Sequence, residues 1–257
     1  MVPNIPAAIL TKLEFPPVSH LVEWKDLGGG INKIVLITFA ACIAPLALFL
    51  IAGRKSALVP RGVQNFAESI VDFVHDGIVE QTIGHGGEAW MPLLLSIFSF
   101  VFVCNIFEVI PFIQMPASAR MAIPAMLALI VWVVYNVVGF KKQGIRYITN
   151  SIFPPGVPKA LYILVTPIEF VSTFIVRPFS LMVRLFANML AGHLLLVTFA
   201  VLSATLWQRS LLAIIWPLPT VMLVVLTAFE ILVALLQAFI FTMLTAVYIG
   251  ASANPEH

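Results

Sequence analysis

Two uninterrupted apolar stretches near the carboxyl end limit what this chain can fold into. They cover residues 161–206 and about 211–250, and a short polar linker beginning at Trp207 separates them. Each is longer than the roughly 20 residues that a perpendicular membrane span requires. A helix of roughly 40 residues would be about 60 Å long, so we expect both stretches to cross the membrane with a steep tilt or a bend. Pro178 offers a place to bend in the first, and Pro217 marks the start of the second.

Three shorter apolar stretches lie upstream, at residues 33–52, 89–110 and 121–140. Of the 257 residues, 61% are hydrophobic and only 10% are charged, whereas a soluble domain has about 25% charged residues. Each stretch is long enough for one ordinary membrane-spanning helix. The sequence therefore predicts an all-α polytopic membrane protein, with three ordinary transmembrane helices within residues 33–146 and a long, steeply tilted helical hairpin at residues 161–257.

A surface helix is predicted at residues 60–82, where apolar residues recur at helical spacing and acidic residues occupy the other face. The apolar positions are Phe66, Ile70, Phe73, Val74, Ile78 and Val79, and the acidic ones are Glu68, Asp72, Asp76 and Glu80. This pattern is typical of an amphipathic helix at a membrane surface. Because the polar face is acidic, it disfavours anionic lipid, and we expect the helix to dock on a partner protein.

Basic residues indicate how the chain is oriented in the membrane. They follow the first and third spans, at Arg54, Lys55, Arg61, Lys141, Lys142 and Arg146. Because loops rich in Lys and Arg stay on the cytoplasmic side, we expect the N-terminus outside and the C-terminus in the cytoplasm. Residues 1–32 would then form an outer surface segment, and the Pro-rich residues 147–160 would connect the third span to the hairpin.

Several function classes lack their sequence signals. No phosphate-binding loop, nucleotide fingerprint or metal-ligand spacing is present. We therefore expect no cofactor, no bound metal, no nucleic acid partner and no enzymatic activity of the chain by itself. Cys42 and Cys104 lie inside apolar stretches and are expected to pack as small hydrophobic residues. The start of the chain shows neither a signal peptide nor a transit peptide, which favours a bacterial plasma membrane over the alternative, a mitochondrial inner membrane.

One arginine stands in the first long apolar stretch with no acidic residue near it in sequence. An arginine at the centre of a membrane helix costs about 2.5–3.5 kcal/mol by insertion scales, so Arg184 is predicted to be a functional cation that lines a bundle interior or a watery cavity. Ser180 and Asn188 lie four residues before and after Arg184 and share its helix face. His193 is nine residues from Arg184 and is expected to point to nearly the opposite side.

The second long helix also carries a polar stripe. Its members fall within one narrow sector of the helix and are Thr227, Glu230, Gln237, Thr245 and Tyr248. Hydrogen bonds between helices are the usual role of Ser, Thr and Gln in membranes, and that interpretation suits Ser180, Thr227 and Thr245. It suits Arg184 and Glu230 poorly, because burying a charged group in a membrane is much more costly.

Two long motifs carry a family resemblance. The segment from Arg177 to His193 reads RPFSLMVRLFANMLAGH, and the segment from Leu236 to Tyr248 reads LQAFIFTMLTAVY. Both, in this order, closely resemble the signatures of subunit a of F-type (F1Fo) ATP synthases, the membrane stator of the proton turbine. The resemblance is strongest from about Pro167 to Ala251.

The resemblance implies a function. The chain would be a proton-channel stator whose two offset half-channels pass protons to and from a carboxylate on each subunit of the c-ring. Arg184 would face the ring as the electrostatic barrier, and proton flow would drive rotation and ATP synthesis at catalytic sites on other subunits. Its partners would be the c-ring, the subunit b peripheral stalk, the rest of the complex and the lipid bilayer.

The resemblance also implies a proton path. His193 and Glu230 match a pair that the family fills with His and Glu in either arrangement, and with Asn105 and Glu108 they are expected around an outer half-channel. The alternative for Glu108 is that it simply lies among the lipid headgroups at the end of the second span. Glu169 is expected at the inner half-channel. Its distance from Arg177 is one residue longer than the family's usual spacing, and a local bulge would restore its direction.

Three polar residues are expected to support Arg184. Gln237 matches the family's polar residue that faces the arginine, and Asn188 and Ser180 lie on the arginine's own face.

Two other functions remain as alternatives. A secondary ion transporter would show inverted repeats, which the sequence lacks. An intramembrane enzyme using the His/Glu pair would need a nucleophile or metal cluster on facing helices, and none occurs at suitable spacing.

Overall fold

The computed structural model describes residues 33–54, 59–84, 86–110, 118, 120–153, 161–207 and 215–253. Every regular element within these residues is helical, which confirms the predicted all-α fold. Five of the described helices are long and apolar enough to cross a membrane. The predicted outer segment at residues 1–32, and residues 154–160 of the predicted Pro-rich connection, lie outside the described residues.

The three shorter spans form close to where the sequence predicts them. They are α3 (Lys33–Gly53), α6 (Met91–Ile106), which continues the short turn η2 (Gly87–Trp90), and α7 (Ala122–Gln143). All three consist almost entirely of apolar residues, as a lipid environment requires.

The second span ends at Ile106, before the predicted end at residue 110. Beyond it the chain tightens, and the amides of Glu108 and Val109 each donate to a carbonyl three residues back, at 3.1 Å. Pro111 disfavours helical geometry in residue 110, and the observed helix ends four residues before that position. Glu108 therefore lies on a turn rather than on the helix itself.

The predicted hairpin is present as two very long helical segments. The first comprises α9 (Tyr162–Val171), η5 (Ser172–Val176) and α10 (Arg177–Leu206), and the second is α11 (Pro217–Ala253). Near the hairpin tip the rings of Trp207 and Trp216 meet edge to face, with centroids 4.5 Å apart. The predicted start of the second helix at Pro217 is confirmed.

The irregular turn of the first long helix lies at η5 rather than at Pro178, where the sequence suggested a bend. Pro178 lies in the first turn of α10, directly after η5 in one continuous helical segment, and its missing N–H leaves the carbonyl of Phe174 without an α-helical donor. The preceding residues Ser172–Val176 form a π-helical turn instead. The proline therefore adjoins the irregular turn without being its centre.

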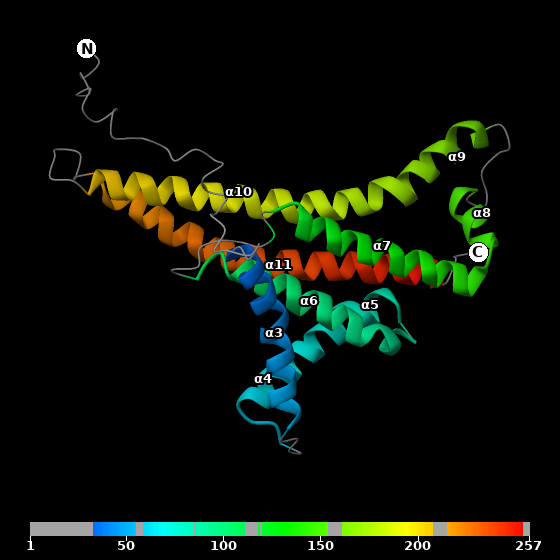
Figure 1. Ribbon diagram of the computed structural model, residues 1–257, viewed down its shortest axis with the longest axis horizontal. Helices are drawn as coiled ribbons and strands as arrows, with labels where there is room; N and C mark the ends of the chain where they lie inside the picture. Colours follow the sequence, from blue (N-terminus) through cyan, green and yellow to red (C-terminus); the bar gives the residue numbers. More distant parts are fainter. Residues whose placement is uncertain are drawn as a thin grey trace, which may run out of the picture.

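The hairpin organises the other helices (Figure 1). α10 and α11 run side by side along the longest axis of the molecule, α7 packs against both, and α6 packs against α11. α8 (Arg146–Ile152) and α9 lie together at the end opposite the hairpin tip. Fully buried side chains from these helices form the core, among them Leu94, Tyr135, Leu181, Leu185, Phe241 and Ile249.

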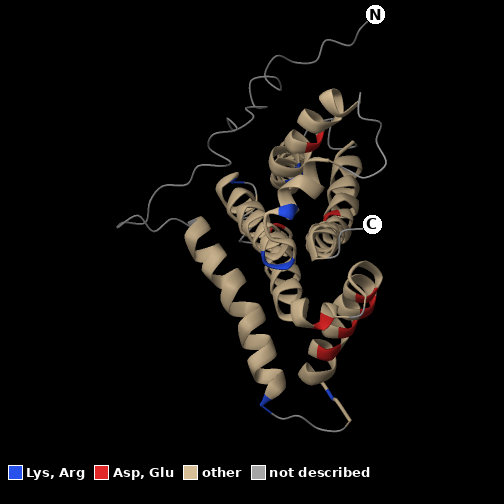
Figure 2. Ribbon diagram, turned by 90° about the vertical axis from the view of Figure 1, so that its right-hand side faces the viewer, with Lys and Arg blue, Asp and Glu red and all other residues tan. Residues whose placement is uncertain are grey.

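The predicted amphipathic helix forms as α4 (Val63–Val74), a π turn η1 (His75–Val79) and α5 (Glu80–Thr82). Val74, Ile78 and Val79 are buried, whereas Phe66, which lies on the same predicted apolar face, is 58% exposed. The acidic residues gather on the outside of this segment (Figure 2), and Glu68, Asp72, Asp76 and Glu80 are all exposed. The two faces are thus chemically distinct, as the sequence predicted.

A glycine lets α8 pack closely on α7, and replacing it tests the packing. A methyl group at Gly139 would overlap ring atoms of the buried Tyr147. We expect Gly139→Ala to lower the free energy of unfolding by about 1–3 kcal/mol, because overpacking forces side chains or backbone to shift. Thermal unfolding of the detergent-solubilised chain measures the change. The matched control is Gly53→Ala, where an added methyl meets nothing within 4 Å; equal stability of the two variants would contradict the prediction.

Candidate functional site

Arg184 lies on the outer face of the hairpin. Its side chain is exposed, whereas its neighbours Leu181 and Leu185 are buried against the bundle. It forms no hydrogen bond or ion pair with any residue that the structure describes. In an apolar helix such a cation requires water or an external partner. The arrangement therefore leaves Arg184 available to a group outside this chain.

The predicted polar stripe around Arg184 divides into two kinds of residue. The Ser180 hydroxyl donates to the carbonyl of Arg177 at 3.0 Å and is thus used within its own helix. The side-chain nitrogens of Asn188 and Gln237 are buried and have no hydrogen-bond partner. A buried amide without a partner is costly, so these two are the supporting residues with donor capacity to spare.

The threonines of the second stripe do not bridge helices. The Thr227 hydroxyl donates to the carbonyl of Leu223 at 2.7 Å, and the Thr245 hydroxyl donates to that of Phe241 at 2.8 Å. Both acceptors lie one turn back on α11 itself. The expected interhelical hydrogen bonds are therefore wrong for these two side chains, because bonding to the preceding turn satisfies a Thr hydroxyl locally.

Glu230 projects from α11 onto α10 at a glycine. A Cβ atom at Gly192 would lie 2.5 Å from Oε1 and 2.7 Å from Cδ of Glu230, so the carboxyl group occupies the space that a larger residue would fill. Glu230 is 5% exposed, and its Oε2 atom is buried without a hydrogen-bond partner. Gly192 is therefore part of the Glu230 site.

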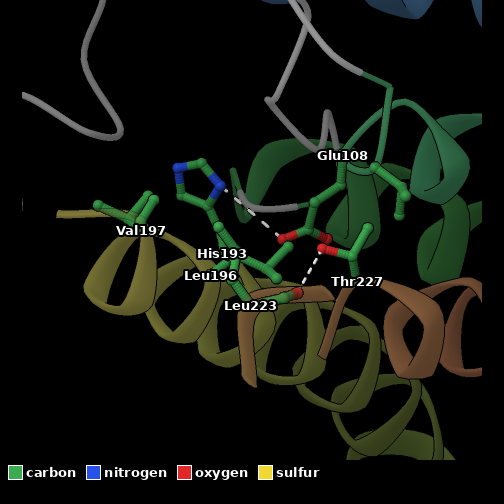
Figure 3. A pocket seen from close by; sticks show the side chains of 8 residues that line it. Glu108, His193, Leu196, Val197, Leu223 and Thr227 are labelled. Atoms are coloured by element: carbon green, nitrogen blue, oxygen red, sulfur yellow. Dashed lines mark hydrogen bonds and ion pairs between the residues drawn. The ribbon is translucent and has the colours of Figure 1, made fainter. Parts of the chain in front are cut away.

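His193, the residue after Gly192, faces Glu108. Its Nδ1 atom lies 3.8 Å from Oε1 of Glu108, and both side chains are buried (Figure 3). Next to them is a cavity of about 230 Å³, also lined by Thr227 and by the apolar side chains of Val109, Leu196, Val197, Ala200 and Leu223. The structure thus brings His193, Glu108 and Glu230 together from three separate segments.

Asn105 and Glu169 take other positions. Asn105 is buried and its Oδ1 accepts a hydrogen bond from Ser118 Oγ at 3.0 Å, so it ties the end of α6 to the segment that follows. It does not line the cavity beside His193. Glu169 is half-buried on α9, toward the far end of the long helix from His193 (Figure 1). The structure therefore separates Glu169 from the outer cluster.

Sequence reasoning missed Gly192. The signal was present, because a glycine immediately before a histidine inside a membrane helix leaves room for a side chain of the facing helix. Thr227 was assigned to a polar stripe, and its place in the cavity wall came only from the structure.

The described residues hold no group of three His, Cys, Asp or Glu side chains that would bind a metal ion. The cluster of His193, Glu108 and Glu230 contains groups that take up and release protons, and the imidazole is the one whose unperturbed titration lies nearest neutrality. The absence of a cofactor and of a metal elsewhere in the chain stays a prediction.

Known proteins resemble this chain over most of its length. The family model described as "ATP synthase A chain" matches residues 34–250. ATP synthase subunit a of Rhodococcus erythropolis is 44% identical over 95% of this chain and 89% of its own length. The subunit a of Frankia alni is 42% identical over 91% of this chain and 84% of its own, and that of Methylobacterium sp. is 41% identical over 92% and 94%.

These relatives span nearly the whole chain, and the matched range includes every residue of the outer cluster together with Arg184 and Glu169. The predicted resemblance is thereby confirmed. The chain belongs to the ATP synthase subunit a family, a membrane component of the Fo sector that takes part in proton transport and ATP synthesis.

Proposed function

We propose that this chain forms two offset half-channels, which pass protons to and from a carboxylate on the c-ring and so couple proton flow to rotation. One observation carries the proposal. Arg184 is exposed and unpaired among the described residues, while the titratable cluster of His193, Glu108 and Glu230 is buried and lies toward the hairpin tip. The hairpin thus carries the fixed charge together with His193 and Glu230, and the turn after α6 adds Glu108 to the protonatable path.

Arg184 acts as a fixed cation in this proposal. A guanidinium stays protonated at any working pH and has no acceptor lone pair, so it does not shuttle protons. A nearby positive charge favours the ionised form of a carboxyl group. A protonated ring carboxyl that approaches Arg184 therefore releases its proton, and the same charge blocks direct proton transfer between the half-channels.

The outer half-channel would begin at the cavity beside Glu108 and His193. A cavity of about 230 Å³ with polar groups in its wall has room for several water molecules. From there His193, Glu108 and Glu230 are close enough to relay a proton toward the ring. Asn105 supports the path because its carbonyl accepts a hydrogen bond from the amide of Glu108 at 3.1 Å, in the turn that carries Glu108.

The inner half-channel would include Glu169, which lies at the other end of the long helix. Asn188 and Gln237 would hold Arg184 or order water beside it, since both have buried amide nitrogens without partners. The catalytic ATP sites would lie on other subunits, and the chain would not be an enzyme by itself.

The proposed setting is a bacterial plasma membrane, with the N-terminus outside and the C-terminus in the cytoplasm. Basic residues at Arg54, Lys141, Lys142 and Arg146 support this orientation. The partners are the c-ring, the subunit b peripheral stalk and lipid. The ring would contact the face of α10 that carries Arg184.

Replacing Arg184 by Ala tests the role of the fixed cation. We expect ATP-driven proton pumping into inverted membrane vesicles to fall to background, because the ring carboxyl loses the charge that makes it release its proton. ATP hydrolysis by the detached soluble sector is expected to persist. The matched control is Arg146→Ala, an exposed arginine on α8. Normal pumping by the Arg184 variant would refute the proposal.

Gly192 and Glu230 provide a second test, on the outer half-channel. Glu230→Gln removes the titratable group, and Gly192→Ala displaces the carboxyl group from its notch. We expect each to lower passive proton conductance by about tenfold or more, since misplacement by about 1 Å can cost as much as a hundredfold. Gly77→Ala is the control, because its added methyl meets only Phe239 at an ordinary 3.7 Å. Unchanged conductance in both test variants would remove Glu230 from the path.

A further inference from the structure

The first long helical segment, from Tyr162 to Leu206, contains one turn of π-helix, η5 (Ser172–Val176), between Glu169 and Arg184. The amide of Arg177 donates to the carbonyl of Ser172, five residues back, rather than to Thr173. A π turn holds one residue more than an α turn. The extra residue in the spacing between Glu169 and Arg177 is therefore accommodated at this turn.

This turn leaves two carbonyl groups without their α-helical donors. The carbonyl of Thr173 would accept from the amide of Arg177, which bonds to Ser172 instead. The carbonyl of Phe174 would accept from residue 178, which is a proline and has no N–H. Carbonyl groups without a partner are costly in a bilayer, since no water reaches them there.

Two side chains of α7 supply the missing donors. The Tyr135 hydroxyl donates to the carbonyl of Thr173 at 2.9 Å, and Trp132 Nε1 donates to that of Phe174 at 3.1 Å. Tyr135 is fully buried. Each carbonyl that the π turn and the proline free thus has its own donor on one neighbouring helix.

Tyr135, which bonds the carbonyl of Thr173, also contacts the second helix of the hairpin. The ring of Tyr135 meets that of Tyr248 on α11, with centroids 5.8 Å apart. The guanidinium of Arg177 lies 5.4 Å from the centroid of the Tyr248 ring. The π turn is therefore fixed by α7 and followed directly by a residue that packs on α11.

The π turn decides which way Glu169 points. In a straight α-helix, at about 100° per residue, Glu169 would lie about 160° from the direction of the buried Leu185, away from the bundle. With one residue taken up by the π turn, it lies about 60° from Leu185 and about 40° from Arg184. Thr173 is 2% exposed and therefore faces the bundle, as Leu185 does. This burial agrees with the directions calculated with the π turn, because in a straight helix Thr173 would lie about 120° from the direction of Leu185.

We propose that Trp132 and Tyr135 are positioning residues for the proton path: they stabilise the π turn, which aims Glu169 toward the helix face that carries Arg184. This inference rests on the proposed function, in which Glu169 serves the inner half-channel. Without the two donors, the segment rewinds toward a regular α-helix, and Glu169 rotates away from the bundle.

The first test removes the donors in the assembled ATP synthase. Passive proton conductance is measured in inverted membrane vesicles stripped of the catalytic sector. The double variant Trp132→Phe/Tyr135→Phe is expected to conduct about three- to tenfold less, since each hydrogen bond between membrane helices contributes a factor of about three. The matched control is Tyr147→Phe, which removes a buried hydroxyl that bonds to Asn136. In a Glu169→Gln background, the double variant is expected to cause no further loss.

The second test removes the extra residue. Ile175 is 55% exposed and lies in the π turn. Deleting it lets the segment become a regular α-helix while Glu169 keeps its direction, so conductance is expected to be retained. The deletion makes the direction of Glu169 independent of the π turn and places the amide of Phe179 four residues after the carbonyl of Phe174, whereas the carbonyl of Thr173, then four residues before Pro178, still relies on Tyr135. The deletion is therefore expected to restore most of the conductance lost in Trp132→Phe/Tyr135→Phe. Inserting one Ala after Ile175 turns Glu169 by about 100° and is expected to lower conductance as Glu169→Gln does.

The outcomes separate this inference from the proposed function. If Arg184→Ala still pumps, the proposed function fails, whatever the other variants do. If Arg184→Ala and Glu169→Gln both lose proton flux, the proton conductance of the Ile175 deletion variant decides whether the inference holds. A deletion variant that fails to assemble, or that conducts as poorly as Glu169→Gln, overturns the inference, because residue 175 is then not an extra residue that the π turn accommodates. Undiminished conductance in Glu169→Gln also overturns it.

Discussion

The constraint on which this structure depends is the absence of water inside a bilayer. Every buried carbonyl, amide and charge must find its partner within the protein, or else mark a place where another molecule or water supplies one. Most side-chain hydroxyls of the long helices meet this constraint by donating to the preceding turn, as Thr227 and Thr245 do. Among the described residues, the groups that do not meet it locally include Arg184, Asn188, Glu230 and Gln237.

These exceptions are ordered in space. Arg184 stands on the outer face of α10, and Glu230 lies in the notch at Gly192 on the face that packs against α11. His193 continues that side toward Glu108 and the cavity. One helix thus keeps a permanent charge apart from titratable groups, which is the separation that two offset half-channels require. The hairpin provides this separation because α10 is long and because Arg184 and His193 lie on different faces of it.

Much of the fold was predictable because membrane helices are encoded by composition and length. The apolar stretches gave the spans to within a few residues, and the two motifs identified the family. The end of α6 at Ile106 was less predictable, and so was the exact place of the bulge that the spacing of Glu169 and Arg177 suggested, which lies at Ser172–Val176. Both depend on local hydrogen bonds that compete with the α-helix, and apolar composition does not record that competition. The same reason explains why the threonines were assigned wrongly to interhelical bonds.

The sequence by itself determined the spans, the family, the cation at Arg184 and the identity of the titratable residues, because these follow from residue type and spacing along one helix. Only the tertiary structure decided that His193 meets Glu108, that Glu230 rests on Gly192, and that Trp132 and Tyr135 bond the carbonyls of the π turn. These contacts join segments far apart in the chain. Their geometry depends on how helices rotate and slide against one another, which the pattern along a single helix does not specify.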